Sequence, residues 1–94
     1  MKKLPPHAKY YFDQFTNDGG AWNWHEFDVR RFRTFIHATH RYHVRLSAPE
    51  LEKLLMAKHF DEENASALAD RYQFGRKLLK ERPTFNYIGL NRNR

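Results

Sequence analysis

The chain has 94 residues, with 17 Lys and Arg against 11 Asp and Glu, so its formal net charge is +6 at pH 7. It has no cysteine, which excludes disulfides, metal sites with cysteine ligands and thiol catalysis. No apolar run reaches the roughly 18 residues of a membrane span, and the first residues lack the apolar stretch of a signal peptide. We therefore expect a cytoplasmic (intracellular) protein with no membrane contact.

A chain of this length forms one domain with a small core. We expect residues 1–94 to be that single domain, with flexible ends at residues 1–6 and 91–94. Aromatic residues make up 16% of the chain, which argues against disorder because such large apolar side chains favour burial.

The positive charge is concentrated in two blocks. Residues 30–45 hold five arginines and no acid, and residues 71–94 hold seven basic residues against one acid. Residues 46–70, which lie between the blocks, hold two basic and six acidic residues. This alternation predicts a polarised surface if the fold brings the two basic blocks together, which the sequence leaves open.

The first helix is predicted to begin after Pro5 and Pro6 and to run to about Asn17. Its buried face has apolar residues at helical spacing, namely Ala8, Tyr11, Phe12 and Phe15. The Asn-Asp-Gly-Gly run at residues 17–20 ends this helix, because these residues accept positive φ angles.

The second helix is predicted over residues 24–40, since Asn23 and Glu26 have the spacing of a capping box. Trp22 and Phe27 flank that cap at the positions of a hydrophobic staple. The core-facing residues of this helix recur at helical spacing and are Val29, Phe32, Phe35, Ile36 and Thr39.

The third helix is predicted from a second capping box, formed by Ser47 and Glu50, and ends at about Lys58. Its buried residues are Leu51, Leu54 and Leu55. The preceding residues 43–46 alternate between polar and apolar, which suits a short strand or an extended link.

The fourth helix is predicted to begin near Asp61, because acidic residues stabilise the positive end of a helix dipole. Its buried stripe comprises Ala65, Leu68, Ala69, Tyr72 and, if the helix passes Gly75, Leu79. Phe74 falls on the opposite face, so either Phe74 is exposed or the helix ends at Gly75, and the sequence leaves both open. Pro83 stops any helix, and residues 84–88 suit one short strand.

These elements predict a mainly α fold, a small bundle of about four helices. Their order over about residues 25–90 also resembles that of a winged helix-turn-helix domain, which would add one or two short strands. The resemblance implies that the helix after the turn, residues 61–82, enters the major groove of DNA. That helix opens with Asp61, Glu62 and Glu63, which repel phosphates, so the arginine-rich second helix is the better contact surface.

Residues 21–27 and 45–51 each resemble the second half of an EF-hand loop, with an apolar residue at the strand position and Glu at position 12. The resemblance implies calcium ligands at loop positions 1, 3 and 5. Those positions hold Phe15, Asn17 and Gly19 in one copy and Thr39, Arg41 and His43 in the other. These side chains do not supply the oxygens that calcium needs, so we interpret both segments as capped helix starts.

A candidate nucleic-acid-binding face lies on the second helix, opposite its core-facing stripe, and comprises Arg30, Arg33, His37 and Arg41. Arginine suits this role because its planar fork of donors matches phosphate. The alternative is a solvated helix face, but such faces normally mix both signs of charge, and no acid lies within residues 30–45. Lys77 and Lys80 complete the candidate set, with the preference for cations at a helix C-terminus as their alternative explanation.

His37, His40 and His43 are spaced by three, but no Asp, Glu or Cys stands beside them and Arg41 lies among them, so we expect no metal site. Mild acidification would raise the positive charge of this segment. The serines lack a Gly-rich elbow and the chain has no phosphate-cradling loop. We therefore expect no enzymatic activity and no cofactor.

The sequence favours a small basic non-enzymatic protein that acts on nucleic acid, or on a nucleoprotein complex, through its Arg-rich helix face. The alternative is a protein–protein inhibitor or adaptor of the mobile-element or phage type, or an accessory subunit of a larger assembly. For that alternative, Phe74 is the candidate interface residue. The small core leaves a homodimer or an obligate complex open.

Overall fold

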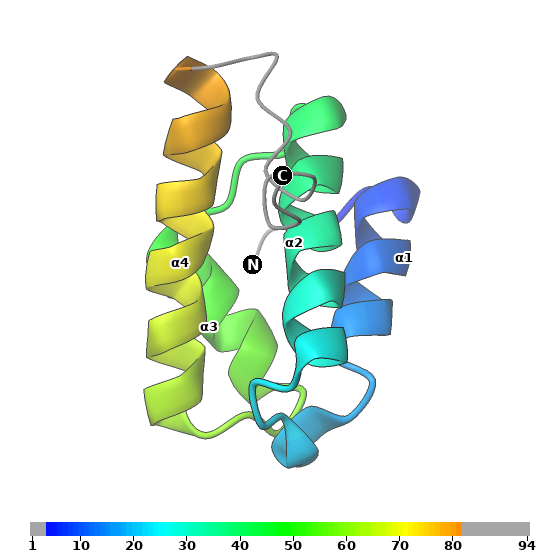
Figure 1. The fold of residues 1–94 in the computed structure, drawn as a ribbon, viewed down its shortest axis with the longest axis vertical. Helices are drawn as coiled ribbons and strands as arrows, with labels where there is room; N and C mark the ends of the chain where they lie inside the picture. The colour runs from blue at the N-terminus through cyan, green and yellow to red at the C-terminus, as the bar shows by residue number, and fades with distance from the viewer. Residues whose placement is uncertain (1–3, 82–94) are drawn as a thin grey trace.

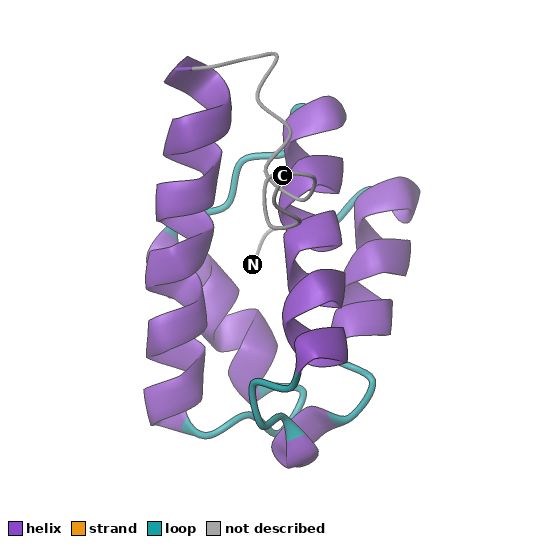
Figure 2. Cartoon of the chain, in the orientation of Figure 1, coloured by secondary structure: helices purple, strands orange, loops and turns teal. Residues whose placement is uncertain are grey.

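The computed structural model describes residues 4–81, which form an all-α domain of four helices (Figure 1). The helices are α1 (Pro6–Phe15), α2 (Glu26–Arg41), α3 (Ala48–Met56) and α4 (Glu62–Glu81), and a short 3₁₀ turn, η1 (Gly19–Ala21), follows α1. No strand occurs within residues 4–81 (Figure 2). The prediction of a mainly α bundle of about four helices is confirmed. In the same part of the chain, no helix is both long enough and apolar enough to span a bilayer.

The helices pack as two neighbouring pairs. One pair is α1 with α2, the other is α3 with α4, and α2 also contacts α4. In Figure 1, α2 lies between α1 and α4, and α3 packs behind them. Because α2 and α4 run in the same direction, their C-terminal ends lie at the same end of the domain (Figure 1). Each of these two ends carries part of one basic block.

An aromatic cluster forms the centre of the core, around Phe15 at the end of α1. The Phe15 ring centroid lies 5.1–6.4 Å from those of five other rings, which belong to Phe12, Trp22, Phe32, Phe35 and Phe60. Such ring pairs contribute about 0.5–1.5 kcal/mol each beyond the area they bury. The cluster therefore joins α1, α2, the α1–α2 loop and the α3–α4 loop into one core.

The two predicted capping boxes have different outcomes. At α3, the Glu50 N–H donates to the Ser47 hydroxyl at 3.2 Å and the Ser47 N–H donates to the Glu50 carboxylate at 2.8 Å, so that capping box is confirmed. At α2 the prediction is wrong, because the helix begins at Glu26 and no side chain caps it. Instead, the buried Asp28 carboxylate accepts the backbone N–H of Asn23 at 3.2 Å.

The packing of two tryptophans, and not a capping side chain, determines the backbone before α2. Trp22 is buried in the aromatic cluster, and Trp24 donates its indole N–H to the Asn64 side chain of α4 at 3.0 Å. To direct both indoles this way, the chain adopts a positive φ of 58° at Trp24. Residue 24 is therefore not helical, and Phe27, predicted to form a staple with Trp22, is exposed instead.

The α4 helix continues through Gly75, which leaves Phe74 60% exposed on its outer face. Its start is capped by Asp61, whose carboxylate accepts the Asn64 N–H at 2.7 Å. His43 is a turn residue and residues 44–46 form a link without regular secondary structure, so the alternative of a short strand there is wrong. The strand predicted at residues 84–88 lies outside the described residues.

The helix boundaries otherwise follow the prediction within about two residues, the usual uncertainty of helix ends. Pro5 and Pro6 are the N-cap and the first residue of α1, and the predicted flexible residues 1–3 and 91–94 lie outside the described part of the chain. The sequence did not indicate that two histidines end helices with a positive φ, of 58° at His43 and 73° at His59.

A Schellman motif closes the C-terminal end of α2. The Val44 N–H donates to the Thr39 carbonyl at 2.8 Å and the His43 N–H donates to the His40 carbonyl at 3.2 Å. This position usually holds glycine, but here it holds His43. The motif ends the helix abruptly and directs the following link toward α4, whose side chains bind it as described below.

Gly19 packs directly on the α3–α4 loop, and this contact generates a stability prediction. Its φ is 54°, and a Cβ there would lie 2.8 Å from the Lys58 carbonyl oxygen. We expect Gly19→Ala to lower the free energy of unfolding, measured with urea, by about 2 kcal/mol, because left-handed strain adds to the close contact. Gly20→Ala is the matched control, since its Cβ would lie 3.1 Å from the His59 carbonyl oxygen. A loss for Gly20→Ala that equals or exceeds that for Gly19→Ala would contradict this account.

Candidate nucleic-acid interface

A series of hydrogen bonds joins the C-terminal end of α2 to α4. The buried Tyr72 hydroxyl donates to the Thr39 hydroxyl at 3.0 Å, and Thr39 donates to the Ile36 carbonyl at 2.8 Å. Arg76, one turn further along α4, donates to the Tyr72 hydroxyl at 2.9 Å and to the Val44 carbonyl. All of these acceptors are neutral, so the series fixes the Arg76 guanidinium in place without neutralising its charge.

Gln73 of α4 holds the α2–α3 link at a second point, because its Nε2 donates to the Leu46 carbonyl at 2.8 Å. The side chains of Val44 and Leu46 are buried in the core. The residue between them, Arg45, is therefore exposed at the surface beside α4. This explains the polar–apolar alternation at residues 43–46, since the link buries every second side chain while side chains of α4 bind its carbonyls.

These contacts form a cleft of about 410 Å³, here termed the basic cleft, between the end of α2, the link and α4. Its lining residues are His40, His43, Arg45, Gln73, Arg76, Lys77 and Lys80. Four of them are arginines or lysines, and no acidic residue lines the cleft. Within residues 4–81, no carboxylate forms an ion pair with Arg76, Lys77 or Lys80. The fold thus brings parts of both basic blocks to one concave surface.

The predicted nucleic-acid-binding residues fall in three places. Lys77 and Lys80 line the basic cleft. His37 and Arg41 line a second pocket next to it. Arg30 and Arg33 lie further toward the start of α2, and about 16 Å along the helix axis separates Arg30 from Arg41. The structure therefore places His37 and Arg41 beside the basic cleft, and Arg30 and Arg33 outside both hollows.

Acidic residues compensate the arginines in the first half of α2. Arg30 lies 3.0 Å from the Glu26 carboxylate, and Arg31 lies 3.4 Å from Asp28 and 3.8 Å from Asp18. All three acids precede residues 30–45, the acid-free stretch, in the sequence. In the structure they nevertheless pair with its first two arginines, Glu26 and Asp28 from the first turn of α2 and Asp18 from the loop before it. For Arg30, the arrangement fits the alternative of a solvated face with i,i+4 ion pairs.

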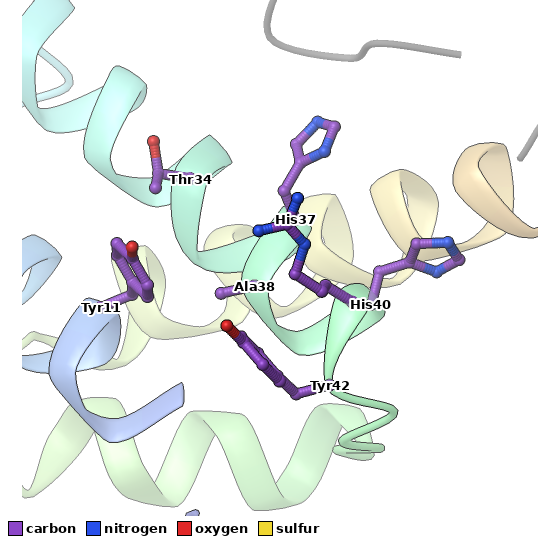
Figure 3. Close-up of a pocket in the computed structure, with 7 residues that line it drawn as sticks. Tyr11, Thr34, His37, Ala38, His40 and Tyr42 are labelled. Carbon is purple, nitrogen blue, oxygen red and sulfur yellow. The ribbon is translucent and has the colours of Figure 1, made fainter. Parts of the chain in front are cut away.

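The second pocket, here termed the tyrosine pocket, has a volume of about 300 Å³. Its lining residues are Tyr11, Thr34, His37, Ala38, His40, Arg41 and Tyr42. Figure 3 shows Tyr11 of α1 and Tyr42, just after α2, on either side of Ala38, while His40 points away from them. Because His40 also lines the basic cleft, the two hollows adjoin each other at the end of α2.

Two histidines at this end of α2 experience a positive environment. Burial lowers the pKa of His40 from its usual 6.5, and the charges of Arg76 and His43 lower it further. Burial is also the main reason for the lowered pKa of His37, with smaller contributions from His40 and Arg41. A further positive charge is thus unfavourable here, and a bound anion would offset that cost.

The exposed aromatic residues lie on several elements. Phe74, the predicted protein-interface residue, is exposed on α4 but lines neither hollow. Phe27 is 69% exposed, and the Arg30 guanidinium lies 5.8 Å from its ring centroid. Tyr42 is 40% exposed and is the one exposed tyrosine, among the described residues, that lines the tyrosine pocket.

Sequence reasoning missed Arg45, Arg76, His40 and His43 as members of the site. Arg45 and Arg76 belong to the two basic blocks, but helical periodicity places neither of them on the predicted faces. The signal for Arg45 was the alternation of residues 43–46, which predicts that Arg45 points away from two buried neighbours. Nothing in the sequence indicated that Arg76 binds a carbonyl of the link.

Within residues 4–81, no group of three or more His, Asp or Glu side chains is arranged to hold a metal ion. Comparisons with models of protein families, with curated proteins and with solved structures give no match. The functional argument therefore depends on the geometry and charge of the site itself.

The hydroxyl of Tyr72 is central to the series that joins α2 to α4. We expect Tyr72→Phe to lower the free energy of unfolding by about 1–2 kcal/mol, because it removes hydrogen bonds to Thr39 and Arg76 in a buried place. Urea denaturation measures this change. Tyr10→Phe is the control. Because Tyr10 is 58% exposed, removal of its hydroxyl should change the free energy of unfolding by less than about 0.5 kcal/mol. Equal effects of the two changes would contradict a structural role for the series.

We expect the protein to lose stability as the pH falls from about 7.5 to about 6. A histidine whose pKa is lower in the folded state than in the unfolded state binds fewer protons when folded, so protonation below the usual pKa of 6.5 favours unfolding. The free energy of unfolding in urea should fall less over this range in a His37→Gln/His40→Gln variant. Asp13 does not contribute, because its hydrogen bond with Lys9 and the nearby Lys58 hold its pKa below 3.8. The same fall in both proteins would contradict this assignment.

Proposed function

We propose that this protein is a small non-enzymatic binding protein that holds the phosphates of a nucleic acid in the basic cleft. The observation that carries the proposal is the meeting of Arg45, from the first basic block, with Arg76, Lys77 and Lys80 of the second, in a cleft without acidic residues. A merely solvated surface would mix both signs of charge, as the first half of α2 does.

The cleft suits phosphate for reasons of charge and shape. Cations on a concave surface focus the electrostatic potential and attract a polyanion from a distance. Arginine can bind phosphate oxygens through two parallel hydrogen bonds, and lysine contributes a point charge. Arg76 is preorganised, because its bonds to Tyr72 and Val44 hold it in place before a ligand binds.

The proposal differs from major-groove recognition by the start of α4. Asp61, Glu62 and Glu63 lie at that start, whereas Lys77 and Lys80 lie about 25 Å further along the helix axis. Phosphates would therefore meet the C-terminal end of α4 and not its acidic start. The resemblance to a winged helix-turn-helix domain stays a proposal, because residues 84–88, where the sequence predicts a strand, lie outside the described part of the chain.

A protein partner is the second candidate, and the exposure of Phe74 favours it. A large aromatic side chain that is 60% exposed on a regular helix suits a place at the centre of a protein interface. The partner would be a nucleic-acid-handling protein, a larger assembly or a second copy of this chain. Such an interface depends weakly on salt, whereas phosphate binding depends on it steeply.

We expect the triple variant Arg45→Ala/Lys77→Ala/Lys80→Ala to bind nucleic acid more weakly and with a lower salt dependence. The slope of log affinity against log salt should fall by about 0.7–0.9 for each phosphate contact that is lost. Fluorescence anisotropy of labelled duplex DNA and single-stranded RNA, between about 50 and 200 mM salt, measures both quantities.

The matched control is Lys9→Ala/Arg30→Ala/Lys53→Ala, which removes the same charge from exposed residues away from the basic cleft. This control should keep most of the affinity and the slope of the unchanged protein. Equal losses in the two triple variants would show that only net charge matters. Absence of salt-sensitive binding by the unchanged protein would leave a protein partner as the better account.

A further inference from the structure

The tyrosine pocket adjoins the basic cleft, and its composition differs from that of the cleft. It presents the two aromatic rings of Tyr11 and Tyr42, the apolar surface of Ala38 and a few polar groups. Its volume of about 300 Å³ is at the lower end of the range for small-ligand sites. A pocket of this size and chemistry suits a flat, partly polar ring rather than a phosphate.

The aromatic rings of the pocket are held in place before any ligand binds. The Tyr42 ring stacks on His7 with centroids 4.6 Å apart and an interplanar angle of 9°. The Tyr11 ring packs edge-on against Tyr10 at 5.1 Å. Tyr42 nevertheless remains 40% exposed, so part of its surface is open to a ligand. Rigid exposed aromatic rings are what proteins use to stack unpaired bases.

The chain leads directly from the pocket to the cleft. Arg41 and Tyr42 line the pocket, His43 and Arg45 line the cleft, and His40 lines both. The Schellman motif fixes this turn of the backbone, so the tyrosine pocket and the basic cleft keep a constant separation. A ligand that fills both must carry a flat ring next to a run of phosphates.

We propose that the protein binds single-stranded nucleic acid, with one unstacked base in the tyrosine pocket and the adjoining phosphates in the basic cleft; this inference rests on the proposed function. A duplex does not satisfy both hollows, because its bases are stacked and paired inside the helix. Thr34, His37 and Arg41 supply hydrogen-bonding groups around the base, and Tyr42 supplies the stacking surface.

The test uses three labelled probes of equal length at the same salt concentration: single-stranded oligo-dT, a single strand of the same backbone with abasic sites throughout, and duplex DNA. We expect the unchanged protein to bind oligo-dT about tenfold more tightly than the abasic strand, since stacking of one base contributes roughly this much. It should also bind oligo-dT more tightly than the duplex.

Tyr42→Ala should lower the affinity for oligo-dT to that for the abasic strand, while the abasic affinity and the salt slope stay unchanged. Tyr42→Phe keeps the stacking surface and should retain the preference. Phe27→Ala is the control, because Phe27 is 69% exposed but lines neither the pocket nor the cleft. Urea denaturation establishes that each variant is folded.

The outcomes separate this inference from the proposed function. Salt-sensitive binding that is equally tight for all three probes would overturn the base pocket and leave the phosphate cleft standing. An equal effect of Tyr42→Ala on oligo-dT and on the abasic strand would also overturn it. Absence of salt-sensitive binding to every probe would overturn both.

Discussion

The bond from the Arg76 guanidinium of α4 to the Val44 carbonyl is the contact on which the proposed site depends. It holds the link after α2 against α4, with Gln73 and the buried Tyr72–Thr39 pair supporting it on either side. A charged donor makes a stronger hydrogen bond than a neutral one, so this single side chain can fix the link. Because both acceptors are neutral, the positive charge of Arg76 is not compensated by them and can attract an anionic ligand. One residue therefore both positions the two basic blocks and belongs to the cleft that they form.

The electrostatic character of α2 changes along its length. At its start, Glu26, Asp28 and Asp18 pair with Arg30 and Arg31, which also suits the positive end of the helix dipole. At its end, the helix meets the positive side chains of α4 in a cleft with no acidic lining residue. Within residues 4–81, basic side chains from the end of α2, the following link and α4 thus meet at one end of the domain. This polarity, more than the total charge, supports a polyanionic partner.

The sequence allowed the helices to be predicted, and it predicted the site less well, for physical reasons that particular residues illustrate. The Ser47 cap and the apolar stripes depend on neighbours within a few residues, so they can be read from the sequence alone. The Asn23 cap fails because two tertiary contacts, the burial of Trp22 and the hydrogen bond from Trp24 to Asn64, determine the backbone there. Arg76 could not be assigned to the site, because its acceptor lies in a link more than 30 residues earlier in the chain.

The most direct test of the central claim is a titration of the ¹⁵N-labelled protein with a single-stranded oligonucleotide at low salt, followed by amide chemical shifts. The account predicts that the largest shifts fall at the residues that line the basic cleft, namely His40, His43, Arg45, Gln73, Arg76, Lys77 and Lys80. Shifts centred on Phe74 and the outer face of α4, on the start of α2, or on no residue at all would contradict it.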